Sequence, residues 1–156
     1  MTSVIVDKSQ AVKRINEYSF ARVEEKLIME GKLAPHVMEE AITEFRKYLV
    51  LIALGHNRVG MCSKEVDEVW HTFILFTKDY TVFCLEVFGF FLHHEPALLS
   101  QPLGSEPRQR FLEAYNLEFG TPPKIWITNA DCSPNTGGGG NECSPEPSCD
   151  GSPEPT

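Results

Sequence analysis

Residues 66–84 decide the fold of this chain, and they read VDEVWHTFILFTKDYTVFC. In the first half of this stretch, apolar side chains recur at the three- and four-residue spacings of one face of an α-helix. These side chains are Val66, Val69, Trp70, Phe73 and Ile74. Ser63 lies just upstream and is a favourable N-cap, so we expect a helix to begin there. Thr77 and Asp79 then re-cap the chain, which predicts a second helix over residues 80–93.

Helical periodicity continues on the N-terminal side of this pair. Residues 7–30 carry apolar side chains at helical spacings and are followed by Gly31, a typical C-terminal stop. Residues 35–55 begin with Pro35, a residue that is favoured in the first turn of a helix. The last half of this segment, YLVLIAL, is apolar on all sides, as in the buried central helix of a bundle.

Two more segments follow on the C-terminal side. Residues 105–119 open with Ser-Glu-Pro, a first-turn sequence, and end before Gly120, which predicts another helix. The segment PPKIWIT, residues 122–128, is expected to be a short extended strap across the body. Together these patterns predict an all-α fold, a single small helical bundle of about five helices.

The composition changes near residue 128. Residues 129–156 hold five Gly and five Pro and no Phe, Leu, Ile or Val, so they lack the apolar surface needed to offset chain entropy. We therefore expect a helical domain over residues 1–128 and a disordered acidic Gly/Pro/Cys tail over residues 129–156. The tail cysteines, Cys132, Cys143 and Cys149, have no C-x-x-C spacing. Four interpretations of these cysteines stay open. They are incidental thiols, sites of metal capture, sites of redox exchange, or part of a modified-peptide precursor with a folded leader.

Charge, hydropathy and cysteine content exclude several classes of protein. The net charge of −8 argues against a nucleic-acid binder. The longest charge-free apolar stretch, residues 48–57, is ten residues long, whereas a membrane-spanning helix needs about 20, so we expect no membrane span. Residues 1–10 contain no basic region followed by an apolar block, so no export signal is expected. The five cysteines are then expected to be free thiols or metal ligands in a reducing cytoplasm.

A candidate metal site follows from the polar residues of the aromatic helix pair. Asp67 and His71 are four residues apart, so they project from one helix face. If the two helices pack antiparallel, His93 and His94 at the end of the second return toward the start of the first. A carboxylate with two or three imidazoles is a ligand set for zinc, iron or manganese, with room for water. We prefer His94 to His93 because it continues the apolar stripe, and we expect binding to weaken below about pH 6.

Each of these side chains also has a purely structural interpretation. Asp67 and His71 can form only an intrahelical hydrogen bond, and a histidine near a helix C-terminus interacts favourably with the helix dipole. Tyr80, Cys84 and Cys62 lie near the site in sequence and are candidates for contacts that support the ligands. Cys84 is equally explained as a small buried hydrophobe. Cys62 precedes a helix start, where a thiolate is stabilised, so a nucleophilic role stays open as well.

The same stretch resembles the signature of the glycine-rich domain-containing protein-like family, in which V-D-x-x-W-H is followed by a Y-x-x-x-C pair. The elements of the signature here are Val66, Asp67, Trp70, His71, Tyr80 and Cys84. The continuation FGFFLHHEP, residues 88–96, is similar to the F-G-x-F-x-H-H-x-P run of short bacterial members. The resemblance implies membership and a functional cluster of Asp67, His71 and His94, and it implies no defined activity.

Three function classes remain after these exclusions. The first is a small cytoplasmic helical module of undefined activity with a divalent-metal site. The second is a structural interaction module without metal, whose aromatic helix pair or acidic tail binds an unknown protein partner. The third is a metal-dependent enzyme, which needs an open coordination position and a general base. The sequence names no substrate, catalytic residue or oligomeric state.

Overall fold

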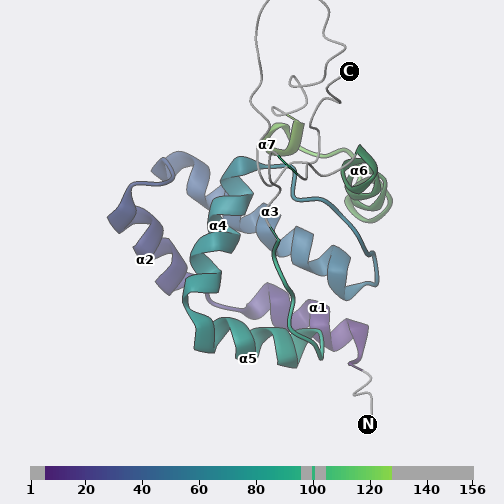
Figure 1. The fold of residues 1–156 in the computed structure, drawn as a ribbon, viewed down its shortest axis with the longest axis horizontal. Helices are drawn as coiled ribbons and strands as arrows, with labels where there is room; N and C mark the ends of the chain where they lie inside the picture. The colour runs from purple at the N-terminus through teal and green to yellow at the C-terminus, as the bar shows by residue number, and fades with distance from the viewer. Residues whose placement is uncertain (1–5, 96–99, 101–104, 128–156) are drawn as a thin grey trace, which may run out of the picture. The chain divides into compact units, whose positions relative to one another are not determined.

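The structure, a computed structural model, describes residues 6–95, 100 and 105–127. The helices in these residues are α1 (Lys8–Glu17), α2 (Ala21–Glu30), α3 (Pro35–Ala53), α4 (Lys64–Leu75), α5 (Thr77–Val87), α6 (Ser105–Phe119) and α7 (Lys124–Ile127) (Figure 1). The described residues contain no strand, so the predicted all-α fold is confirmed, with more helices than expected. None of these helices is long and apolar enough to cross a membrane. The disorder predicted for residues 129–156 lies outside the described residues.

The described residues form two compact units. The first unit consists of the described parts of Met1–His56 and Glu68–His94, and it holds α1, α2, α3, α5 and most of α4. The second unit consists of the described parts of Asn57–Asp67 and Glu95–Thr156, and it holds the first turn of α4 with α6 and α7. Because α4 is one continuous helix, residues along it have the relative positions that helix geometry gives them.

The helix predicted over residues 7–30 is wrong in one respect, because the structure divides it into two. Tyr18 has an extended backbone with ψ 134°, which ends α1 before α2 begins. In an unbroken helix Ile15 and Phe20 would point about 140° apart, and only one of them would face the core. The break allows both side chains to be buried. Gly31 ends α2 in the left-handed conformation, with φ 62°, as the sequence predicted.

α4 and α5 correspond to the stretch that decides the fold. The hydroxyl of Ser63 accepts a hydrogen bond at 3.3 Å from the amide three residues later, so the predicted N-cap of α4 is confirmed. The helix predicted over residues 80–93 is wrong at both ends, since α5 begins at Thr77 and ends before Gly89. Gly89 has a positive φ of 78°, the conformation that commonly terminates helices. The chain that carries His93 is therefore irregular.

The core of the first unit is aromatic and centres on Phe73 of α4. Its ring is surrounded by those of Tyr18, Phe20, Phe45, Tyr80 and Phe83, with centroids 5.1–6.4 Å away. Most of these pairs meet edge to face, which the quadrupoles of aromatic rings favour. The surrounding rings come from the α1–α2 connection, α3 and α5, so this packing fixes α4 against three other parts of the unit.

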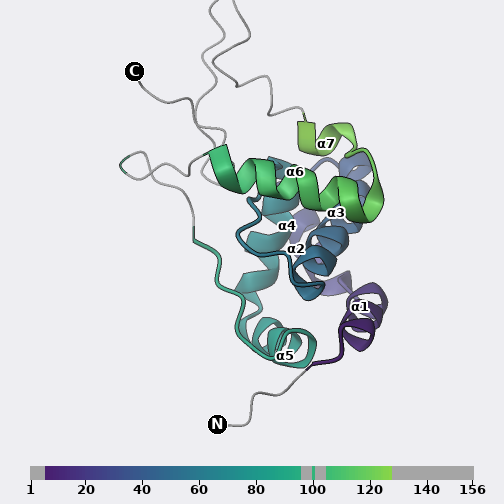
Figure 2. The same cartoon turned by 90° about the vertical axis from the view of Figure 1, so that its right-hand side faces the viewer.

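Basic side chains donate hydrogen bonds to backbone carbonyls at the C-terminal ends of three helices in this unit. α1 packs against α3 and α5, as Figures 1 and 2 show from two sides. From α1, Lys8 donates to a carbonyl at the end of α3 at 3.0 Å, and Arg14 donates to one at the end of α5 at 2.7 Å. From α3, Arg46 donates to a carbonyl near the end of α1 at 2.7 Å, and its guanidinium lies over the Phe20 ring. Each bond places a positive charge at the negative end of a helix dipole.

The second unit is built on the burial of Trp126. This side chain from α7 packs on Phe111 of α6, with ring centroids 4.3 Å apart. The extended strap predicted over residues 122–128 is therefore wrong, because α7 is a helical turn that places Trp126 in the core. In the same unit the amide of Gly60 donates to the carbonyl of Pro107 at 2.9 Å. A Cβ atom at Gly60 would lie only 3.1 Å from the Pro107 backbone, a tight contact that favours glycine at this position.

We expect Arg46→Met to lower the free energy of unfolding by about 2 kcal/mol, because the hydrogen bond from a charged donor to the α1 carbonyl is lost. Methionine keeps most of the apolar stem, so the loss reports on the guanidinium. Urea unfolding followed by circular dichroism measures it. Lys13→Ala, an exposed change on α1, is the control and should change the free energy by less than about 0.5 kcal/mol. Equal effects of the two variants would contradict a specific role for Arg46.

Candidate metal centre

α4 presents Asp67 and His71 one helical turn apart. The apolar residues of the same helix face the core, where Val66, Val69, Trp70 and Phe73 are all buried. Asp67 is itself only 6% exposed, whereas His71 is half-buried. The carboxylate is therefore more shielded from water than the imidazole that follows it on the helix.

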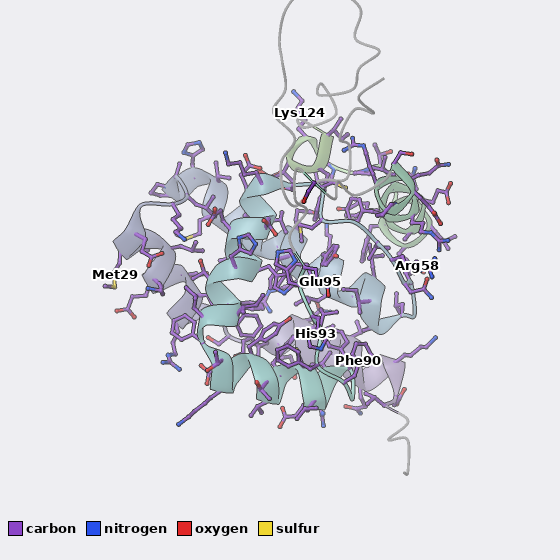
Figure 3. All side chains as sticks on the ribbon, in the orientation of Figure 1. Met29, Arg58, Phe90, His93, Glu95 and Lys124 are labelled. Atoms are coloured by element: carbon purple, nitrogen blue, oxygen red, sulfur yellow. The ribbon has the colours of Figure 1, made fainter. Side chains whose placement is uncertain are left out.

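The segment after α5 brings His94 to this helix. Its Nε2 atom lies 2.7 Å from Nε2 of His71. The His94 ring also stacks on the indole of Trp70, with centroids 4.1 Å apart and planes inclined by 22°. His93, the neighbouring candidate, is exposed on the same segment (Figure 3). Its ring contacts that of Phe91. The structure thus brings His94 to α4 and leaves His93 outside the group.

Asp67, His71 and His94 form a group that is able to hold a metal ion. Each side chain supplies one ligand atom, and these three atoms lie within 4.8 Å of one another. Two ligand atoms of one zinc ion lie at most about 4 Å apart, since each bond to zinc is about 2 Å long. The side chains therefore need to move by less than about 1 Å to share an ion.

The separation of the two imidazole nitrogens restricts what lies between them. At 2.7 Å, one nitrogen carries a proton and the other supplies a lone pair, because two N–H groups or two lone pairs would repel each other. When that proton is lost, both nitrogens have a lone pair that would be available to a metal ion. His71 and His94 are consequently arranged either to share a proton or to hold a cation.

Tyr80 links Trp70 to the segment that carries His94. The indole N–H of Trp70 donates to the Tyr80 hydroxyl at 3.1 Å, and this hydroxyl donates to the carbonyl of Leu92 at 2.5 Å. Burial raises the pKa of Tyr80 far above its usual value, so the phenol is a neutral donor at physiological pH. Burial also raises the pKa of the Cys84 thiol, one turn further along α5.

Cys62 is not part of the metal group. It lies before α4, is fully buried, and its thiol donates to the carbonyl of Gly60 at 3.6 Å. A thiol buried in apolar surroundings is a poor nucleophile. Its burial therefore gives no support to the nucleophilic role that the sequence left open.

The comparison with known families gives a match that covers more than half of the chain. A family model described as UCP032817-like matches residues 10–117. The chain belongs to the UCP032817-like family. No curated protein and no solved structure matches the chain. The UCP032817-like match spans the whole metal group, and the resemblance to glycine-rich domain-containing proteins stays a prediction.

The sequence of this UCP032817-like chain does not reveal two contacts of the site. Trp70 fits the apolar stripe of α4, so its stacking on His94 has no separate signal. Leu92 takes part through its backbone, which no residue pattern marks. Tyr80 does carry a signal, because a hydroxyl within an aromatic stripe needs a hydrogen-bond partner when it is buried.

The raised pKa of Tyr80 predicts a loss of stability in alkaline solution. The folded protein resists ionisation of this phenol, whereas the unfolded chain ionises near the ordinary pKa of 10.0. The stabilising contribution is therefore complete below about pH 10 and is lost as the pH rises further. From pH 8 to pH 10.5, the free energy of unfolding should fall by about 0.8 kcal/mol more in the wild type than in Tyr80→Phe. Urea titrations at both pH values measure this, and equal losses would show that Tyr80 ionises normally in the folded state.

Proposed function

We propose that this chain binds one divalent transition-metal ion through Asp67, His71 and His94. The grouping of one carboxylate and two imidazole ligand atoms within 4.8 Å carries the proposal. Two of these residues come from α4 and the third from the segment after α5. An intrahelical contact between Asp67 and His71 alone would not require His94 to approach them.

The chemistry of the ligands supports zinc, iron or manganese as the bound ion. Imidazole nitrogens and a carboxylate oxygen suit all three metals. Three protein ligands leave at least one coordination position for water, as in catalytic zinc sites. Asp67 is buried and would offset the charge of the ion, while the half-buried imidazoles place the open position toward solvent.

A second candidate function is a protein-interaction module without metal. It is favoured by apolar side chains that the first unit exposes to solvent. Val82 and Leu85 of α5 are each 54% exposed, and Phe90 just after this helix is 52% exposed (Figure 3). Val82 and Leu85 are three residues apart, so they lie on one helix face.

We also propose a cytoplasmic location for the chain. Cys62 and Cys84 are both reduced thiols in the structure, a state that a reducing compartment maintains. Their burial further protects them from oxidation.

Metal binding to the purified protein tests the first candidate. Without an affinity tag, the chain should take up one zinc ion in calorimetry, and zinc in hundredfold excess over Kd should stabilise it by about 2.7 kcal/mol. Asp67→Asn, His71→Ala and His94→Ala should each weaken binding by about tenfold or more. His93→Ala is the matched control, because it removes the adjacent, exposed imidazole, and it should change the affinity by less than about twofold.

Two kinds of result would contradict this proposal. Less than about a tenth of a metal ion per chain in elemental analysis, with no rise in Tm on adding zinc, iron or manganese, would contradict the metal site. Such a result would favour the interaction module. An equal loss of affinity in His93→Ala and His94→Ala would contradict the assignment of the third ligand.

Zinc binding should also depend on pH. Both imidazoles must be without a proton on the coordinating nitrogen, so protons compete with the ion. We expect the affinity to fall as the pH is lowered from 7.5 to 5.5, because the ion must displace any proton that a ligand nitrogen takes up. Calorimetry at the two pH values measures the change. An affinity that is constant over this range would exclude both histidines as ligands.

A further inference from the structure

The segment that carries His94 has no regular structure of its own. Residues 90–95 are irregular, and Phe90, Phe91 and His93 are exposed. A short irregular segment samples many backbone conformations unless other parts of the protein hold it. The position of His94 against α4 therefore depends on contacts from neighbouring helices.

Two side chains of α5 bind the backbone of Leu92. The Tyr80 hydroxyl donates to the Leu92 carbonyl at 2.5 Å. The Leu92 backbone also forms a hydrogen bond with Cys84, and this bond opposes the larger rise in the thiol pKa that burial causes. A bond that favours the thiolate comes from a donor, so the Leu92 N–H is the group that points at the sulfur. One residue is thus held at both of its polar backbone groups.

The spacing of Tyr80 and Cys84 explains why both side chains reach the same part of the backbone. They are four residues apart, so they lie on one face of α5, and both are almost completely buried. Hydrogen bonds shielded from water in this way are stronger than exposed ones. We call Tyr80, Cys84 and the Leu92 backbone the Leu92 clamp.

The clamp is connected to His94 from two directions. Along the chain, His94 is two residues after Leu92, a distance of about 7 Å in an extended backbone. Through space, Trp70 donates to the Tyr80 hydroxyl at 3.1 Å and stacks on the His94 ring at 4.1 Å. The same hydroxyl therefore orients both the backbone before His94 and the indole against which His94 lies.

We propose that Tyr80 and Cys84 are positioning residues, which hold the Leu92 backbone and thereby place His94 beside His71. This role rests on the proposed metal site, because the clamp sets the second imidazole near its coordinating position before an ion arrives. Groups that orient metal ligands typically contribute about 10–100-fold to metal affinity. Aromatic packing alone would not require a hydroxyl and a thiol at these two positions.

A metal-free measurement on the full chain tests the clamp directly. In NMR spectra, the ring current of Trp70 should shift the ring protons of His94 upfield, because the two rings are stacked. Tyr80→Phe and Cys84→Ala should each lose most of this shift. Cys84→Ser keeps a hydrogen-bond acceptor and should retain it. If Tyr80→Phe fails to fold by circular dichroism, the two Cys84 variants decide the result.

Zinc affinity gives the second measurement. Tyr80→Phe and Cys84→Ala should bind zinc about tenfold more weakly than the wild type, with recovery in Cys84→Ser. Tyr18→Phe is the matched control, because it removes a hydroxyl from the same aromatic cluster at the α1–α2 connection. This control should keep both the ring-current shift and the wild-type affinity.

The possible outcomes separate the clamp from the metal site. Unchanged His94 shifts in Tyr80→Phe and Cys84→Ala would overturn the positioning role, whatever their zinc affinity. A wild type that binds no zinc, with shifts that are lost in both variants, would overturn the metal site and support the clamp. Loss of the shift together with loss of affinity, absent from Tyr18→Phe, would support both.

Discussion

Burial of the Phe73 ring determines how α4 is rotated, and the rest of the first unit depends on that rotation. The ring is 1% exposed and is enclosed by aromatic side chains from three other parts of the chain. Turning α4 so that Phe73 met water would cost about 3 kcal/mol. With this ring inside, the helix period leaves Asp67 and His71 at the edge of the core. The rigid aromatic packing therefore also supports the polar group beside it.

Features of the fold that act locally were predictable from the sequence, and those that need a distant partner were not. Ser63 begins α4 through its hydroxyl, and Gly120 ends α6 through its backbone conformation, and a residue pattern reveals both. The break between α1 and α2 exists because side chains on either side of it must both reach the core. Trp126 forms a helical turn where it packs on Phe111, and no local signal reports that partner. Tertiary packing overrides local preference at both places.

The candidate site also combines features that the sequence predicts with features that it does not. The approach of Asp67 to His71 follows from helix geometry alone, so their spacing was sufficient. The sequence favours His94 because it continues a helical stripe, but α5 ends before Gly89 and the backbone is not helical at that point. His94 reaches α4 by the turn at Gly89 and by contacts to the Leu92 backbone. The residues of the site are visible in the sequence, while the path of the backbone between them is not.

The bonds from Lys8, Arg14 and Arg46 to carbonyls at the ends of neighbouring helices have a consequence for unfolding. Lys8 and Arg14 of α1 bind carbonyls at the C-terminal ends of α3 and α5, and Arg46 of α3 binds a carbonyl near the C-terminal end of α1. Fraying of α1 or α3 therefore deprives another helix of the cation at its C-terminal end, and the unpaired carbonyl weakens that helix in turn. α1 and α3 therefore depend on each other at their ends, and the opening of either one also weakens α5 through the loss of Arg14.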